Sequence, residues 1–228
     1  ITKINPLKRL RSRLVFMIKK FYLKTFFSWD NYNNKEKYVF FALHVQPEGS
    51  TMAKAPFFLN QLALVENVSK SIPLDTTLIV KEHKGMIGQR DVNYYINMQK
   101  IPNVKIVHPD IDSHKLIKNS LAVFSITGTA CLEGNLLKKP AFVFGYVFYN
   151  KYSNLINLSK IDPNEWYLII RNKLIHDNHD ENELIKILTK IFANSFRGNY
   201  VEPLFDPKNV LAESNVKELS KQISNKLN

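Results

Sequence analysis

Short apolar runs alternate with amphipathic segments through the central part of the chain. The runs are continuous stretches of Val, Ile, Phe and Leu, a pattern typical of strands that are buried on both faces. They occupy residues 38–45, 76–83, 104–109, 121–126 and 140–145. Segments with helical periodicity lie between them, at 57–71, 89–100, 113–119 and 128–137. Because helices between strands require parallel pairing with right-handed crossovers, we predict an α/β fold, a Rossmann-like parallel sheet with helices on both faces.

The segments on either side of this alternating region follow a different pattern. After residue 146 the pattern is less regular, and we expect one short strand at 166–170 and helices at 181–193 and 215–227. We therefore divide the chain into an N-terminal arm, a Rossmann-like domain, and a helical segment that wraps the sheet and completes the domain. These parts comprise residues 1–37, 38–150 and 151–228, respectively.

Most of the positive charge lies in the N-terminal arm. The chain has a formal net charge of +12, and residues 1–37 contain ten Lys and Arg residues against two acidic ones, which leaves +4 for the other 191 residues. A nucleic-acid-binding function for the whole domain therefore loses its main support, and we expect no nucleic-acid partner. Apolar residues such as Leu7, Leu10 and Leu14 recur at helical spacing among the cations, so the arm is predicted to be a basic amphipathic helix.

Two interpretations of this predicted helix remain open. In the first, residues 7–29 contact an anionic membrane surface, with Phe16, Phe26, Phe27 and Trp29 as interfacial anchors and the cations facing lipid head groups. In the second, the helix packs on the rest of the fold or on a further domain, or links two domains, and its basic face is solvated.

Composition excludes several other classes of protein. The chain is 45% hydrophobic and 12% aromatic, with only 7 Gly and 10 Pro, which is a globular rather than a disordered composition. Cys131 is the only cysteine, which excludes an internal disulfide and a cysteine-based metal site and favours a reducing compartment. The apolar runs are far shorter than the roughly 20 residues that a membrane-spanning helix needs. Because the chain begins with Ile1 rather than Met, we expect that upstream residues are missing from it.

Polar residues follow four of the predicted strands, at the point where each strand ends. They include His44 after the first strand, His83 after the second, His108 after the third and Ser125 after the fourth. Because ligands of open parallel sheets bind beyond the carboxyl ends of the strands, these residues are expected to gather at one edge. The glycine patterns of dinucleotide-binding and P-loop proteins do not occur, which disfavours a NAD-type dehydrogenase and a P-loop NTPase.

The stretch from Ser125 to Thr129 has the composition of a phosphate-binding turn. A strand that runs into Ser, Thr and Gly and then into a helix leaves backbone N–H groups and hydroxyls at the ligand edge of the sheet. The same residue types serve as a helix N-cap without any ligand, and taken alone this second interpretation is favoured. Glu133, on the same helix, is either a candidate acceptor for ribose hydroxyls or a solvated carboxylate. His83, flanked by Lys81 and Lys84, is either a donor to phosphate or a structural histidine.

Three segments together resemble the nucleotide-sugar-binding half of bacterial capsule polysaccharide biosynthesis proteins, the family that contains the Kdo transferases of capsule and lipopolysaccharide assembly. They are HVQPEGST (44–51), KEHKG (81–85) and SITGTACLEGNLLKKPAFVFG (125–145). The similarity covers about residues 38–150. The order S-x-T-G-T-x-x-x-E-G, followed by a short helix and a K-P strand, is similar to the second domain of two-domain (GT-B) glycosyltransferases. The resemblance implies a fold like one half of a GT-B enzyme, with the other half upstream, cut away or on a partner chain.

The resemblance also implies roles for individual residues. In the family a Lys-x-His-Pro motif contacts the donor phosphate; Lys81 and His83 match it, and Lys84 replaces the proline. Gln46 and Glu48 match a segment at the cleft between the two domains, so Glu48 is expected to face donor or acceptor. The expected catalytic residues are His83 and Glu48. The expected donor-binding residues are Ser125, Thr127, Gly128 and Thr129 for the phosphate, Glu133 for the ribose, and Lys81, Lys84 and Gln46.

The function that this resemblance implies is a glycosyltransferase. It would move a sugar, Kdo from CMP-Kdo, onto a bacterial surface polysaccharide or its lipid carrier. Such a reaction is expected to need no metal or cofactor besides the nucleotide-sugar donor, and to take place in the bacterial cytoplasm or peripherally at the inner face of the cytoplasmic membrane. Two alternatives stay open: a glycerophosphate-type transferase or UDP-sugar epimerase, and a non-catalytic module that binds a glycan or another partner.

Overall fold

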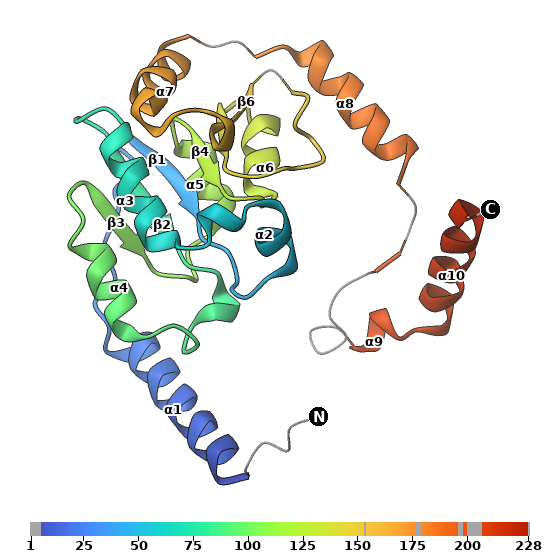
Figure 1. The fold of residues 1–228 in the computed structure, drawn as a ribbon, viewed down its shortest axis with the longest axis horizontal. Coiled ribbons are helices and arrows are strands. Elements are labelled where there is room, and N and C mark those ends of the chain that lie inside the picture. The colour runs from blue at the N-terminus through green and yellow to red at the C-terminus, as the bar shows by residue number, and fades with distance from the viewer. Residues whose placement is uncertain (1–5, 153, 177–178, 196–197, 200–206, 228) are drawn as a thin grey trace. The chain divides into compact units, whose positions relative to one another are not determined.

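The structure, a computed structural model, describes residues 6–152, 154–176, 179–195, 198–199 and 207–227. The chain forms two compact units, residues 1–180 and 181–228. The first unit contains the sheet, whose described strands all pair in parallel in the order β3-β2-β1-β4-β5-β6 (Figure 1). The strands are β1 (Tyr38–Ala42), β2 (Thr77–Lys81), β3 (Val104–Val107), β4 (Val123–Ser125), β5 (Ala141–Val143) and β6 (Leu155–Asn157). This is the Rossmann strand order, and it confirms the predicted fold class.

Helices precede, connect and follow the strands of the first unit. They are α1 (Pro6–Thr25), α2 (Gly49–Lys54), α3 (Gln61–Ser71), α4 (Val92–Gln99), α5 (Ser113–Asn119), α6 (Ala130–Leu136) and α7 (Trp166–Ile175), with the 3-10 helices η1 (Pro56–Phe58), η2 (Lys84–Met86), η3 (Leu158–Lys160) and η4 (Pro163–Glu165). Helix α3 packs with α4 and α7, and α5 packs with α6. Right-handed crossovers place these two groups on opposite faces of the sheet, because the strand order reverses after β3.

One predicted strand is wrong, and one strand was missed. Residues 166–170, expected as a strand, begin α7, in which Trp166 and Ile170 are buried one helical turn apart. A five-residue apolar run does not by itself distinguish a buried strand from a buried helix, and here the helical pattern continues through Ile175. The last strand is instead β6, which pairs with β5. Strand β6 and α7 therefore complete the first unit.

Aromatic and aliphatic side chains fill the core on both faces of the sheet. The rings of Phe124 and Phe142 stack across β4 and β5 with centroids 4.7 Å apart, and Phe41 stacks on Phe124 at 6.5 Å. Helix α6 packs closely on β4 because Gly134 has no side chain; a Cβ there would lie 2.8 Å from Cγ2 of Val123. Cys131, also on α6, is fully buried, and burial raises the pKa of its thiol.

The arm is a helix, as predicted, but its C-terminal end belongs to the core. Leu23 is buried, and Phe27 and Trp29 pack against the core with their rings 4.7 Å apart. The indole N–H of Trp29 donates to the carbonyl of Leu23 at 2.9 Å. The expectation that Phe27 and Trp29 are interfacial anchors is therefore wrong, because both rings are partly buried and pack against Tyr95 on the helix α4. Phe26 remains exposed. None of the helices that the structure describes has the length and hydrophobicity to cross a membrane.

The second unit contains the two helices that the sequence predicts. They are α8 (Glu181–Ala193) and α10 (Glu213–Leu227), separated by the short α9 (Pro207–Val210). Both longer helices carry apolar residues on one side, such as Leu184 on α8 and Val216 on α10. The expectation that this segment wraps the sheet stays a prediction.

Candidate functional site

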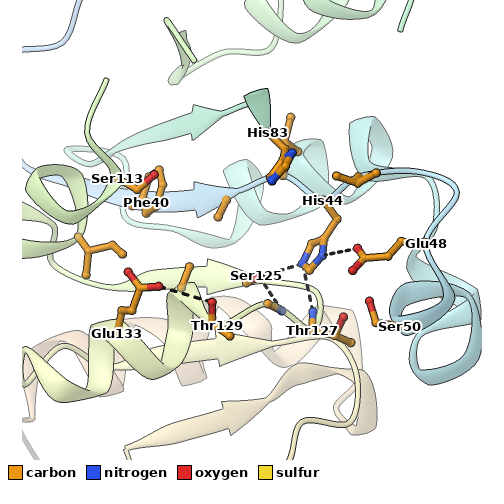
Figure 2. A pocket seen from close by; sticks show the side chains of 16 residues that line it. Phe40, His44, Glu48, Ser50, His83, Ser113, Ser125, Thr127, Thr129 and Glu133 are labelled. Atoms are coloured by element: carbon orange, nitrogen blue, oxygen red, sulfur yellow. Dashed lines mark hydrogen bonds and ion pairs between the residues drawn. The ribbon is translucent and has the colours of Figure 1, made fainter. Parts of the chain in front are cut away.

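A cavity of about 440 Å³ opens beyond the carboxyl ends of β1, β2 and β4. Strands β1 and β4 lie side by side in the sheet, and the direction in which successive strands are added reverses between them. Ligands of open α/β sheets bind at such a position. Figure 2 shows the side chains that line the cavity. Seven of the ten predicted site residues are among them: Glu48, His83, Ser125, Thr127, Gly128, Thr129 and Glu133.

His44, at the end of β1, is hydrogen-bonded to the turn that follows the neighbouring strand β4. Its Nε2 atom accepts hydrogen bonds from the backbone N–H groups of Ile126 and Thr127, each at 3.2 Å, and lies 2.9 Å from the hydroxyl of Ser125 (Figure 2). Because Nε2 accepts, the ring proton is assigned to Nδ1, which lies 3.5 Å from a carboxylate oxygen of Glu48. Burial lowers the pKa of His44, and Glu48 acts in the opposite direction. The buried ring is therefore neutral at pH 7.

The turn after β4 is held by these internal bonds, which corrects one expectation about it. The N–H groups of residues 126 and 127 bind His44, and the N–H of Gly128 donates to Ser125 Oγ at 3.1 Å. These amides are not free for a phosphate, contrary to the prediction. The hydroxyl of Thr127, in contrast, is buried at the cavity and has no hydrogen-bond partner among the described residues. The hydroxyl of Thr129 lies 3.5 Å from the carboxylate of Glu133, on the same helix turn.

Two groups from the end of β2 lie at or beside the cavity: His83 lines it, and Lys81 does not line it but contacts a residue that does. The ammonium of Lys81 lies 2.6 Å from the hydroxyl of Ser113, which lines the cavity. Burial lowers the pKa of Lys81, and within the described part of the chain no carboxylate lies within ion-pair distance of it. His83 accepts the N–H of Gly85 on Nδ1 at 3.2 Å. Its Nε2 therefore carries the proton when the ring is neutral and is a hydrogen-bond donor.

A buried ion pair, which sequence reasoning missed, supports both histidines. The guanidinium of Arg90 binds the carboxylate of Glu82 at 2.7 Å, and the side chains are 9% and 0% exposed. Arg90 also donates to the backbone carbonyl of His44 at 2.7 Å, and Glu82 accepts the backbone N–H of His83 at 2.7 Å. The hydroxyl of Tyr95 donates to the same carboxylate at 3.3 Å. Burial raises the pKa of Glu82, and the guanidinium opposes that shift. This Arg90–Glu82 pair fixes the ends of β1 and β2 relative to each other.

Besides Lys81, two further predicted donor-binding residues are not part of the cavity lining. The side-chain amide of Gln46 donates to the carbonyl of Leu59, and its oxygen accepts from Arg90 at 3.0 Å. Lys84 pairs with Asp110 at 3.3 Å, on the other side of the turn that follows His83. Both side chains are therefore occupied by contacts within the protein, and neither faces the candidate site.

Within the described residues, no group of three or more His, Cys, Asp or Glu side chains is arranged to hold a metal ion. The expectation that the reaction needs no metal or cofactor stays a prediction.

Comparisons with known proteins give one family and several similar folds. The family model of capsule polysaccharide biosynthesis proteins matches residues 27–152, more than half of the chain. Similar solved structures include the β-Kdo 2,7 transferase KpsC of Thermosulfurimonas dismutans, with 17% identity and a TM-score of 0.45 over 68% of this chain and 48% of that one. The UDP-GlcNAc 2-epimerase of Methanocaldococcus jannaschii has 13% identity and a TM-score of 0.49 over 81% and 50%. The chain thus spans about half the length of these proteins. No curated protein matches it significantly.

Proposed function

Because the chain belongs to the capsule polysaccharide biosynthesis protein family, we propose that its cavity binds the nucleotide-activated sugar of a glycosyl transfer. The acceptor in this proposal is a bacterial surface polysaccharide or its lipid carrier. Kdo, carried by CMP, is the sugar that we propose, at the inner face of the cytoplasmic membrane.

One observation carries the proposal: three hydrogen-bond donors lie at or beside one cavity. They are the Nε2–H of His83 and the hydroxyl of Thr127, which line it, and the half-buried ammonium of Lys81, which contacts Ser113 of its lining. A desolvated cation without a carboxylate partner favours an anionic ligand, and hydrogen bonds to charged groups are stronger than neutral ones. Phosphate oxygens accept from all three kinds of donor. The cavity volume of about 440 Å³ is in the range of small-molecule sites.

Each polar group has a place in the proposed reaction. Lys81, His83 and Thr127 hold the donor phosphate, and the carboxylate of Glu133 accepts hydrogen bonds from ribose hydroxyls. An acceptor hydroxyl oxygen forms a bond to the anomeric carbon of the sugar and loses its proton to a base. The bond between that carbon and the phosphate oxygen breaks, and the nucleotide leaves with the electron pair. Lys81 and His83 stabilise the negative charge that develops on it, because they are already oriented before the reaction. Glu48 faces the cavity from the side opposite to Glu133 (Figure 2).

We also propose that α1 contacts an anionic membrane surface, but with fewer aromatic residues than the sequence suggested. Helix α1 has no acidic residue, and its exposed apolar side chains include Leu10, Leu14 and Phe21. Phe27 and Trp29 have no part in this contact, since they belong to the core.

Calorimetric titration of CMP, CDP and UDP into the chain tests the donor site. CMP is expected to bind, and His83→Ala or Lys81→Met is expected to weaken binding at least tenfold. The expected size follows from the loss of one hydrogen bond to a charged group, about 1.5–3 kcal/mol. His176→Ala is the matched control, because His176 is an exposed histidine at the C-terminal end of α7.

The alternatives give different results. Preference for UDP over CMP would replace CMP-Kdo by a UDP-sugar. Equal effects of the His83 and His176 variants would remove His83 from the site. Failure of every nucleotide to bind would favour the non-catalytic binding module.

A further inference from the structure

A second, smaller cavity lies on the other side of the turn that carries His83. Its volume is about 130 Å³. Its walls come from α1, from the segment that follows α1, and from the turns after β2 and β3. The residues that line it are Lys20, Leu23, Lys24, Trp29, Lys84, Ile87, His108, Pro109 and Asp110. We refer to it as the lysine cavity.

The lysine cavity is positively charged. Three lysines line it against one carboxylate, that of Asp110, which pairs with Lys84 at 3.3 Å. Lys20 and Lys24 have no ion-pair partner among the residues that the structure describes, and Lys20 lies 5.5 Å from the ring centre of Phe16. Three ammonium groups therefore share a single carboxylate at one small opening, since Asp110 also interacts electrostatically with Lys24. Such an arrangement favours binding of an anion.

The remaining walls are fixed before any ligand arrives. Leu23 and Ile87 are buried, and the indole of Trp29 is held by its bond to the Leu23 carbonyl. The ring of His108 lies edge-on to Trp29 at 5.7 Å and accepts the N–H of Asp110 on Nδ1 at 3.1 Å. In the neutral ring Nε2 of His108 consequently carries the proton and can donate. A donor that is already oriented loses little entropy when it binds an anion.

We propose that the lysine cavity binds a phosphate group, separately from the donor cavity. A phosphate matches it in size, charge and hydrogen-bonding capacity, whereas a whole nucleotide fits the larger cavity. The opening adjoins the C-terminal end of α1, where Phe21 on α1 and Phe26 just after it are 62% and 65% exposed and their rings lie 5.7 Å apart. Apolar side chains beside a phosphate site suit a phosphate that is attached to a lipid. When the lysine cavity holds the phosphate of a lipid-linked acceptor, that phosphate and the donor lie on opposite sides of the turn that carries His83 and Lys84.

Two probes distinguish the sources of the phosphate. The first is inorganic phosphate, titrated into the full chain. The second is sedimentation with vesicles that contain phosphatidylglycerol in phosphatidylcholine, or phosphatidylcholine alone. The variant is Lys20→Ala/Lys24→Ala, and its control is Lys35→Ala/Lys160→Ala, which removes the same charge from exposed lysines that do not line the cavity. Melting curves verify that both variants fold.

The expected result is that the Lys20/Lys24 variant loses about tenfold in affinity for at least one probe, and the control loses little. Loss confined to anionic vesicles identifies a lipid phosphate, and loss with inorganic phosphate as well identifies a site for free or attached phosphate. Equal losses in both variants would mean general charge attraction and would overturn the proposal. CMP binding, measured in parallel, reports on the donor cavity. If CMP competes with inorganic phosphate for the same lysines, the lysine cavity is not a separate site.

Discussion

Arg90→Ala is expected to lower the free energy of unfolding by about 3–5 kcal/mol, the typical cost of removing one partner of a buried ion pair. The substitution leaves the fully buried carboxylate of Glu82 without its countercharge. It also removes the donor to the carbonyl of His44. Urea unfolding followed by circular dichroism measures the loss. Affinity for CMP is expected to fall too, because the pair fixes the backbone of both His44 and His83.

Two further variants separate the ion pair from general effects of losing an arginine. Arg171→Ala removes an exposed arginine from α7 and is expected to change stability by less than about 0.5 kcal/mol. Glu82→Gln combined with Arg90→Ala removes the unpaired charge, so the double variant is expected to be more stable than Arg90→Ala alone. A double variant as unstable as the sum of both single variants would show that Arg90 acts independently of Glu82.

His44 is expected to make the protein less stable as the pH falls below about 6.5, the ordinary pKa of histidine. Burial lowers the pKa of His44 in the folded state, so the unfolded state binds more protons between the two pKa values. The contribution is complete above the unfolded pKa and is lost as the pH falls towards the folded one. Its slope is at most about 1.4 kcal/mol per pH unit. Urea unfolding measured from pH 7.5 to 5 tests this.

The control for this pH dependence is His44→Asn, because an amide oxygen can accept a backbone N–H but does not titrate. Glu82, whose pKa burial raises, contributes with the opposite sign, but it is present in both proteins. The difference between the two pH profiles therefore isolates His44. Parallel profiles would contradict the assignment of His44 as a buried neutral acceptor.

The order of strands and helices could be predicted because each apolar run is long enough to show its period. The predicted helix at 113–119 coincides with α5, and all five central strands lie where the pattern places them. The errors concern short elements. Only the first of the three residues of β6 is buried, so no continuous apolar run marks this strand, and α2 has only six residues. The five apolar residues at 166–170 fit a strand as well as a helix, and we predicted a strand. In the structure this run forms a helix that packs on α3.

The candidate site could be predicted where it depends on topology. His83, Ser125 and Glu133 meet because carboxyl ends of parallel strands share an edge. Arg90 could not be predicted, since it lies eight residues beyond Glu82 in a segment without a motif. Arg90 matters because its side chain is buried against Glu82 and His44, and the residues around Arg90 in the sequence give no sign of that burial. Lys84 and Gln46 follow their strands as closely as His83 does, but contacts with Asp110 and Arg90 turn them away from the cavity.

The burial of Cys131 gives the protein an internal chemical reporter. It is the only thiol in the chain, and it lies between α6 and the sheet, 3.4 Å from the carbonyl of Phe142. A thiol reagent reaches it only when α6 separates from the sheet. The labelling rate under native conditions therefore measures how often the helix behind the Ser125–Thr129 turn opens. A ligand that rests on this turn slows the labelling, so occupancy of the site can be followed without an attached dye or tag.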